Sequence, residues 1–424
     1  MRLPRFSPHQ LALLAFLAAY TLLVLHVKET SHRDPSSLFF DPERAFQRNY
    51  SLDREAEAEE WILNVEQGYV RAFPDPTLCI GIPTVQRGGG DAQYFRHLVG
   101  SLLAGLTVEE RKDLLLVTFF ADLEPGDHQA FGEEWVYRVV DEVITYKEAA
   151  AEEQNEVREL VALDQSEGRF DRKPLFDYVH VLKHCLAKGT PYIAILEDDA
   201  IAAEGWFYHT ILGLSMLEDI GEIAETLYLR LFYNERILGW NNEEWLTYLL
   251  RALAVEALVL SLIMTILRYL PSSGRILTPA TVATVIFLLA PMSIGLYFAA
   301  GRLTVSPLPR GLNRMNTFGC CSQALVFPRA QVPALIDYYE GMGMGKIDSL
   351  TELYANAGDW DRWALTPSLF AHVGSKSSKV SFETKWGRSN TENIWNFGFE
   401  EYRREDLRED HLIKPPEGYI EGSL

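Results

Sequence analysis

Three consecutive acids, Glu197-Asp198-Asp199, follow an apolar run and are the residues best suited to chemistry in this chain. Hard carboxylate oxygens bind divalent cations, and a bound cation offsets the negative charge that develops on a departing diphosphate. A cation would also relieve the repulsion among three bunched carboxylates. The competing interpretation is a solvated acidic turn. The triplet therefore predicts a cation-assisted phosphate site at the end of a strand.

A single histidine supplies a second candidate ligand. His372 ends a short apolar stretch within residues 366–374. Imidazole suits manganese better than it suits magnesium or calcium. A lone histidine is more often an ordinary core or surface residue, so His372 counts only beside other evidence.

The segments around the triplet alternate between short apolar strands and helices. We expect them at 78–82, 91–106, 114–120, within 135–145, and at 175–188, 192–196, 206–220 and 226–232. This alternation predicts an α/β fold with a mostly parallel, Rossmann-like sheet and crossover helices. Ligands bind beyond the carboxyl ends of such strands, so Pro83, Thr84 and Asp122 should lie on the same face as the triplet.

An N-terminal membrane anchor is expected to precede this sheet in the chain. Residues 11–27 form an apolar run behind Arg2 and Arg5. The run is long, and no small-residue cleavage site follows it before Lys28, which favours an uncleaved signal anchor over a cleaved signal peptide. The sequon at Asn49 would then lie in the lumen.

Two further apolar runs predict a transmembrane hairpin. Residues 246–270 and 276–301 flank a turn bordered by Arg268 and Arg275. The positive-inside rule places this turn on the cytosolic side. The alternative is a buried helical hairpin of a soluble core.

The hairpin interrupts what we expect to be one catalytic domain, because neither side has enough strands to stand alone. A strand at 322–327, a helix at 333–339 and a helix near Asp348 follow the hairpin. The expected parts are a cytosolic tail (1–10), the anchor (11–27), a lumenal stem (28–76), two parts of the catalytic domain (77–245 and 302–424) and the hairpin (246–301).

Composition narrows the function classes. A formal net charge of -20 argues against a nucleic-acid partner, because phosphate binding needs basic patches. The four cysteines are too few for a disulfide-stapled scaffold and lack zinc-ligand spacing. Each is expected to be a buried, small apolar residue, and any pairing stays open.

Three stretches resemble the metal-dependent glycosyltransferases of the GT-A type, and among these the N-glycan-branching N-acetylglucosaminyltransferases. They are residues 81–87, 195–199 and 367–374. An anchor plus a hairpin inside the catalytic domain, together with residues 318–329, closely resembles the Golgi enzymes that add N-acetylgalactosamine to the first mannose of glycosylphosphatidylinositol (GPI) anchors. The resemblance covers roughly residues 78–378.

The resemblance implies ligands and roles. UDP-GalNAc would be the donor, GPI-anchored proteins the acceptors, the lipid bilayer the setting and Mn²⁺ the cofactor. Asp199 and His372 would hold Mn²⁺, while Glu197 and Asp198 would face the ribose and the sugar. The uridine pocket would involve Pro83, Thr84, Arg87, Asp122 and, before its covering helix, Lys173.

Transfer in the resembled family inverts the anomeric centre, which requires a general base at the acceptor hydroxyl. Asp348 stands where the branching enzymes carry an acid at a helix start. A helix N-cap explains Asp348 equally well. Glu352, one turn on, is the alternative base.

Two other functions remain as alternatives. One is transfer of a different sugar, such as N-acetylglucosamine, to a membrane-proximal glycan. The other is a non-catalytic membrane binding or scaffold protein, which would not need the triplet. For a transferase, a hairpin inside the domain would hold the active site near a lipid-anchored acceptor.

Overall fold

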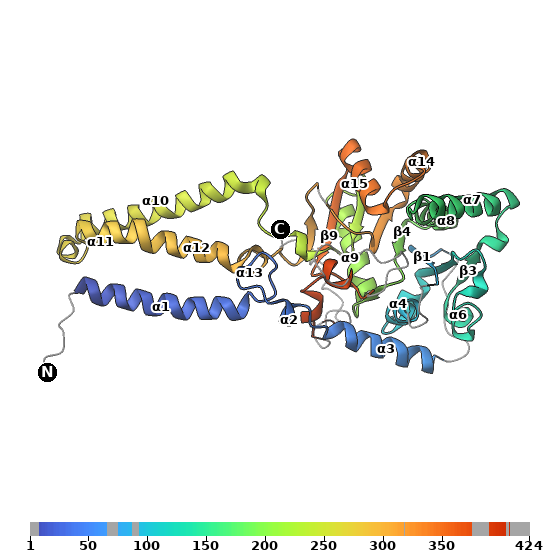
Figure 1. Ribbon diagram of the computed structural model, residues 1–424, viewed down its shortest axis with the longest axis horizontal. Helices are drawn as coiled ribbons and strands as arrows, with labels where there is room; N and C mark the ends of the chain where they lie inside the picture. Colours follow the sequence, from blue (N-terminus) through green and yellow to red (C-terminus); the bar gives the residue numbers. More distant parts are fainter. Residues whose placement is uncertain are drawn as a thin grey trace. The chain divides into compact units, whose positions relative to one another are not determined.

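The computed structural model describes residues 8–65, 75–86, 93–317, 319–374, 390–403 and 407 of the chain (Figure 1). The chain divides into two compact units. Unit 1 comprises Met1–Gln47 and Glu235–Leu308, and unit 2 comprises Arg48–Asn234 and Pro309–Leu424. The chain therefore passes between the units three times.

Unit 1 holds three apolar helical segments where the sequence predicted membrane spans. They are α1 (Pro8–Thr30), α10 (Trp245–Tyr269) and a third that runs from α11 (Pro279–Thr284) through a π-helical turn into α12 (Ala290–Ala300). The apolar stretches within them have mean hydropathies of 2.0, 2.1 and 2.0, and each is long enough to cross a bilayer. The Tyr20 hydroxyl donates to the Met292 carbonyl at 3.0 Å, joining α1 to α12.

The described part of unit 2 is built on an eight-stranded sheet of order β3-β2-β1-β4-β8-β6-β9-β7. β7 and β8 run antiparallel to their neighbours and the other six strands run in one direction. The predicted α/β sheet is thus mostly parallel. The strands are β1 (Leu78–Thr84), β2 (Leu114–Phe120), β3 (Glu142–Thr145), β4 (Tyr192–Leu196), β6 (Thr226–Arg230), β7 (Gly311–Arg314), β8 (Ala324–Pro328) and β9 (Asp361–Thr366).

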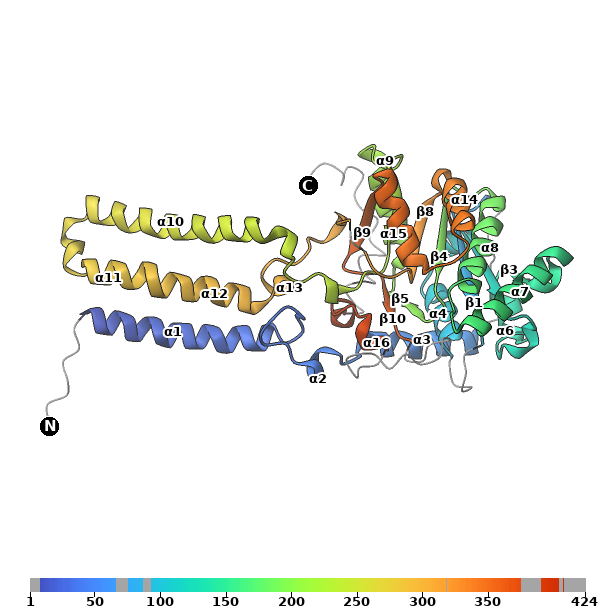
Figure 2. The same ribbon diagram turned by 45° about the horizontal axis from the view of Figure 1, so that its top comes forward.

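Helices cover both faces of this sheet (Figure 2). One face packs against α4 (Tyr94–Leu103), α6 (Glu134–Val139) and α9 (Trp206–Asp219). The other packs against α7 (Ala151–Glu167), α8 (Lys173–Lys188), α14 (Val332–Met342) and α15 (Ile347–Gly358). Side chains alternate between the two cores along β1, where Ile80 joins the first and Cys79 the second.

The strand end at Pro83 differs from the prediction. β1 continues through Pro83 to Thr84, so both residues belong to the strand instead of following it. Pairing between β1 and β4 stops at Gly81, while the Thr84 carbonyl accepts from the Ala121 amide on the β2 side. Pro83 therefore faces the side where the ladder has ended, and its missing N–H leaves no ladder bond unmade.

Residues on both sides of the insertion complete one sheet. β8 follows the insertion but lies between β4 and β6, which both precede it. A second, two-stranded sheet pairs β5 (Ala200–Ala202) with β10 (Phe370–His372). The two pairings bring late residues of the chain to β4 and β5, the strands on either side of the triplet.

Candidate active site

The acidic triplet lies in a tight turn between β4 and β5. The Ala200 amide donates to the Glu197 carbonyl at 3.2 Å, which closes the turn. Asp198 and Asp199 are only 6% and 5% exposed. A solvated acidic turn is therefore wrong, because burying carboxylates is costly unless partners or a cation compensate.

His372 reaches the triplet through the small sheet. In the antiparallel β5–β10 pair, His372 lies opposite Ala200, the residue that follows Asp199. His372 Nε2 stands 3.3 Å from Asp199 Oδ2, and both side chains are buried. A histidine nitrogen and a carboxylate oxygen thus converge from segments far apart in the sequence.

Gly374 leaves room beside this pair. A Cβ atom at 374 would stand 2.8 Å from Asp199 Cγ and closer still to Oδ2, a separation that real Cβ atoms essentially never show. The Asp199 carboxylate therefore occupies the space that any larger residue at 374 would need. The nitrogen and oxygen donors suit a manganese ion, so the residues present fit the metal that the resemblance implies.

Glu197 is held by residues that follow the insertion in the sequence. Ser322 Oγ donates to Glu197 Oε1 at 2.6 Å, and Gln323 Nε2 donates to Oε2 at 3.3 Å. The Glu197 amide also donates to the Gln323 carbonyl at 2.9 Å. Ser322 and Gln323 were not predicted as site residues, although they lie in the stretch 318–329 that carried the resemblance.

Asp198 is bound by Thr84 at the end of β1. Thr84 Oγ1 donates to Asp198 Oδ2 at 2.7 Å and lies 3.0 Å from His128 Nε2. Asp198 and His128 line a pocket of about 210 Å³. Sequence reasoning missed His128, which sits in a loop after β2. Its pocket is also lined by Val85, Gln86, Gln93, Tyr94, Phe95, Arg96, Gln129, Ala130, Glu133 and Trp135.

Asp122 and Lys173 lie at the carboxyl ends of β1 and β2. The Asp122 carboxylate accepts from the Gln86 amide at 3.0 and 3.2 Å. Burial raises the pKa of Asp122, against the lowering effects of that amide and of the Lys173 charge. Lys173 Nζ donates to the Ala121 carbonyl and to Asp177, both at 2.6 Å. Arg87 lies outside the described residues.

The two candidate bases occupy different environments on α15. The helix begins at Ile347 with Lys346 as N-cap, so the N-cap interpretation of Asp348 is wrong. Asp348 is half-exposed and accepts from the Ser349 amide at 2.7 Å. Its other oxygen lies 3.4 Å from the Cys321 amide.

Glu352 is buried among cations. Its carboxylate pairs with Arg230 at 2.7 Å and with Arg362 at 2.9 Å, and it accepts from the Tyr228 hydroxyl. Burial first, and then the Glu352 charge, raise the pKa of Tyr228, although Arg230 opposes them. The two guanidinium groups offset the Glu352 charge inside the core.

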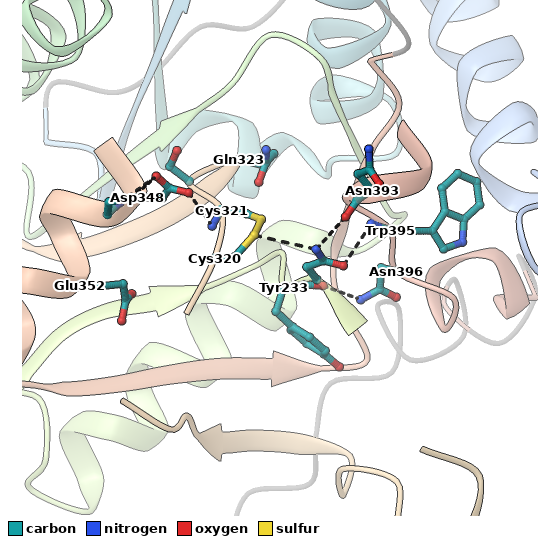
Figure 3. Close-up of a disulfide and its surroundings, with 12 residues drawn as sticks. Tyr233, Cys320, Cys321, Gln323, Asp348, Glu352, Asn393, Trp395 and Asn396 are labelled. Atoms are coloured by element: carbon teal, nitrogen blue, oxygen red, sulfur yellow. Dashed lines mark hydrogen bonds between the residues drawn. A yellow bond between two sulfur atoms is a disulfide. The ribbon is translucent and has the colours of Figure 1, made fainter. Parts of the chain in front are cut away.

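The cysteines are paired, contrary to the expectation of simple buried apolar residues. Cys79 of β1 is bonded to Cys185 of α8, and Cys320 is bonded to Cys321. In Figure 3 the second disulfide lies between Asp348 on one side and Asn393 on the other. Asn234 Nδ2 lies 3.8 Å from Cys320 Sγ and donates to the Asn393 carbonyl at 3.0 Å.

Arg230 ties the disulfide loop to the buried Glu352 network. Its guanidinium donates to the carbonyls of Cys320 and Cys321. Cys321 adopts φ +85°, a left-handed conformation that is uncommon for a residue with a Cβ atom. This loop therefore contacts Glu197 through Ser322 and Gln323, and Asp348 through the Cys321 amide.

A separate acidic cluster brings Glu222, Glu225 and Asp361 within 4.8 Å of one another. Arg314 already pairs with Asp361 there. This cluster contains none of the predicted site residues, and we assign no metal to it.

A comparison with protein families identifies this chain. The model described as GPI-N-acetylgalactosamine transferase PGAP4 matches residues 78–371, more than half of the 424 residues. The match spans the insertion and the site residues from Pro83 to Glu352, and it ends one residue before His372. The chain therefore belongs to the family of the GPI-N-acetylgalactosamine transferase PGAP4.

Proposed function

We propose that this glycosyltransferase moves N-acetylgalactosamine from UDP-GalNAc to the first mannose of GPI anchors, with inversion and with Mn²⁺. The family supports the GPI GalNAc transferase role and implies GPI-anchored proteins as acceptors. The observation that carries the chemistry is the buried Asp199–His372 pair at the end of β4. Burying a carboxylate is costly, and a shared cation would offset that cost at this pair.

The fold proposed for unit 2 is of the GT-A type. Support comes from the mostly parallel sheet, with the triplet after β4 and a small second sheet that returns His372 to it. Ligands of open α/β sheets bind beyond the carboxyl strand ends, where Thr84, Asp122 and the triplet lie. One fold of this kind hosts many functions, so the proposed chemistry rests on the site residues.

Asp199 and His372 are the proposed metal-holding residues. A bound Mn²⁺ supplies Lewis-acid stabilisation of the charge that develops on the UDP leaving group. The chain's own contribution is to hold one carboxylate and one imidazole in place on paired strands. Glu197 and Asp198, each fixed by hydrogen bonds, would face the ribose and the sugar.

Donor binding is proposed to use the ends of β1 and β2. Asp122 lies beside the Gln86 amide, and Lys173 covers the strand end from the start of α8. Pro83 and Arg87 complete the proposed uridine pocket. Burial raises the pKa of Asp122 because it destabilises the charged carboxylate. A hydrogen bond from the donor would stabilise that charged form.

Asp348 is the better candidate for the base. A base must lie within hydrogen-bond reach of the acceptor hydroxyl, take its proton and leave the oxygen to attack the anomeric carbon as UDP departs. Asp348 is half-exposed at the start of α15, whereas Glu352 is buried against two guanidinium groups. Reaching a substrate would cost Glu352 both ion pairs.

The proposed setting is the Golgi membrane, with unit 2 in the lumen. The three apolar helices are consistent with a multi-pass membrane protein. Arg268 and Arg275 border the turn between α10 and α11, which supports a cytosolic turn by the positive-inside rule. With the N-terminus also cytosolic, the three spans in the described part of the chain would leave the residues after α12 in the lumen.

The test uses the full chain in lipid nanodiscs. Release of UDP is measured from UDP-GalNAc and from UDP-GlcNAc, with Mn²⁺ and then with a chelator, and transfer is measured to a GPI-anchored protein. The proposal expects a preference for UDP-GalNAc, loss of activity on chelation and a large loss in Asp199→Ala. Undiminished transfer by Asp199→Ala, or by the chelated enzyme, would refute the metal assignment.

A further inference from the structure

His128 is a buried histidine that the proposed mechanism does not use. It lies in the loop between β2 and α6 and is 7% exposed. The rings of Phe95 and Phe120 pack edge-on against it, with centroids 6.0 and 4.8 Å away. In such an apolar cage a phenylalanine would pack well, so the polar ring requires a reason.

The hydrogen bonds of His128 fix which ring nitrogen carries the proton, and so the direction of a chain of hydrogen bonds, here called the relay, that runs from His128 through Thr84 to Asp198. The Ala130 amide donates to Nδ1 at 3.1 Å, so Nδ1 carries no proton. Burial lowers the pKa of His128 to about 4, which keeps the ring neutral near pH 7 and places its one proton on Nε2. Nε2 then donates to Thr84 Oγ1 at 3.0 Å.

Thr84 passes this direction to the triplet. Because its oxygen accepts from His128, its hydroxyl proton points toward Asp198 Oδ2, 2.7 Å away. Thr84 is 1% exposed, so water does not compete for these bonds. Holding one carboxylate oxygen stops the group from rotating, and the remaining lone pairs keep one direction.

We propose that His128 is a positioning residue for donor binding, which acts through Thr84 to orient the Asp198 carboxylate toward the hydroxyl groups of a bound nucleotide sugar. This inference rests on the proposed function, in which Asp198 contacts the donor. Asp198 and His128 both line the pocket of about 210 Å³, which supports this assignment. Supporting partners of this kind typically change affinity or activity about 10- to 100-fold when removed.

A double-mutant cycle in the nanodisc-embedded full chain tests the relay. The variants are His128→Phe, Thr84→Val and the double variant, and the readouts are KM for UDP-GalNAc, kcat and the unfolding temperature. Each single variant should raise the donor KM about tenfold with a small change in kcat. The double variant should match Thr84→Val alone, because His128 acts only through the threonine.

Two more variants separate this role from packing. His128→Gln keeps an N–H donor and should restore most of the donor affinity lost in His128→Phe. His184→Phe, a half-buried histidine paired with Glu142 at 2.7 Å, should leave the donor KM unchanged. Equal donor KM values in the Phe and Gln variants would overturn the relay, as would multiplicative effects in the cycle.

The outcome for Asp198 distinguishes this inference from the proposed function. If Asp198→Asn raises the donor KM while His128→Phe does not, the relay is wrong and the donor assignment stands. If Asp198→Asn leaves donor hydrolysis intact, the donor assignment itself falls. Should His128→Phe fail to fold, the comparison of Thr84→Val with Thr84→Ser and His128→Gln decides, because only the valine variant lacks the hydroxyl that accepts from His128 and donates to Asp198.

Discussion

Replacing Gly374 with alanine should displace the proposed metal ligand Asp199. A Cβ at 374 would stand 2.8 Å from Asp199 Cγ, whereas carbon atoms pack at about 3.5 to 4.0 Å. The backbone has little freedom to withdraw, because the Val373 amide donates to the Asp199 carbonyl at 2.9 Å and the β5–β10 ladder precedes it. The carboxylate must therefore retreat by about 1 Å.

That displacement is large for a metal ligand. Metal–ligand distances tolerate only about 0.2 Å, so Asp199 would leave its coordinating position. We expect the apparent Mn²⁺ affinity to fall at least 10- to 100-fold, or about 1.4 to 2.8 kcal/mol. Gly374 has no left-handed φ, so the cost comes from the contact and not from the backbone.

The assay is UDP-GalNAc hydrolysis as a function of Mn²⁺ concentration, with direct Mn²⁺ binding followed by electron paramagnetic resonance. Gly126→Ala is the matched control, because a Cβ at 126 meets nothing within 4 Å and that glycine also lacks a left-handed φ. The control should behave as the wild type. An unchanged Mn²⁺ dependence in a folded Gly374→Ala variant would refute the assignment of Asp199 as a ligand.

The candidate base, the buried histidine and the insertion each give a further measurable expectation. Asp348→Asn should lower kcat about 10²- to 10⁴-fold with little change in donor KM or unfolding temperature. Glu352→Gln should instead lower the unfolding temperature, because it leaves buried guanidinium charge unpaired, and the reverse pattern would exchange their roles. As the pH falls from 6.5 to 4, the wild type should lose up to about 3 kcal/mol of unfolding free energy relative to His128→Phe. The pKa of His128 is about 4 in the folded protein and about 6.5, the ordinary histidine value, in the unfolded chain, so the unfolded chain takes up the proton first. Urea titrations across that range check this, and parallel pH profiles would contradict it. Replacing residues 235–308 with a soluble linker should spare donor hydrolysis and abolish transfer to a lipid-anchored protein, whereas unchanged transfer would refute membrane positioning.

The strands that could be predicted from the sequence are those buried on both faces. β2 and β4 end at the predicted residues, because each is a continuous apolar run between polar segments. The triplet could be predicted as a candidate site because an apolar strand that runs into three acids needs compensation for their charge. The three apolar helices of unit 1 could likewise be predicted from their length and hydropathy.

Elements stabilised by charge were not predictable from apolar patterns. β9 begins Asp361-Arg362, and both side chains are buried in ion pairs, so the strand reads as polar. α7 is highly charged and buries few residues, among them Val157, so it lacks an apolar stripe. Local periodicity cannot reveal a partner that lies far away in the sequence.

The supporting residues of the site were invisible for a related reason. His128 occupies a loop without a motif, and its role depends on Thr84 and Asp198, which lie far from it in the sequence. The pairing of Cys79 with Cys185 likewise depends on β1 packing against α8. These contacts exist only after the sheet has formed, so only the three-dimensional arrangement reveals them.

The hydrogen bonds of Glu197 join the candidate active site to chain on both sides of the membrane insertion. Glu197 precedes the insertion, yet its partners Ser322 and Gln323 follow it, as does β8, which fills the gap between β4 and β6. The site therefore needs the chain that leaves unit 2 after Asn234 and returns to it at Pro309. In such a transferase, the chain segments that lead to and from the membrane-spanning helices are also those that complete the sheet, so the sheet is attached to these helices at both ends of the insertion. For an acceptor that is itself lipid-anchored, such a tether raises the effective concentration at the site without any added contact.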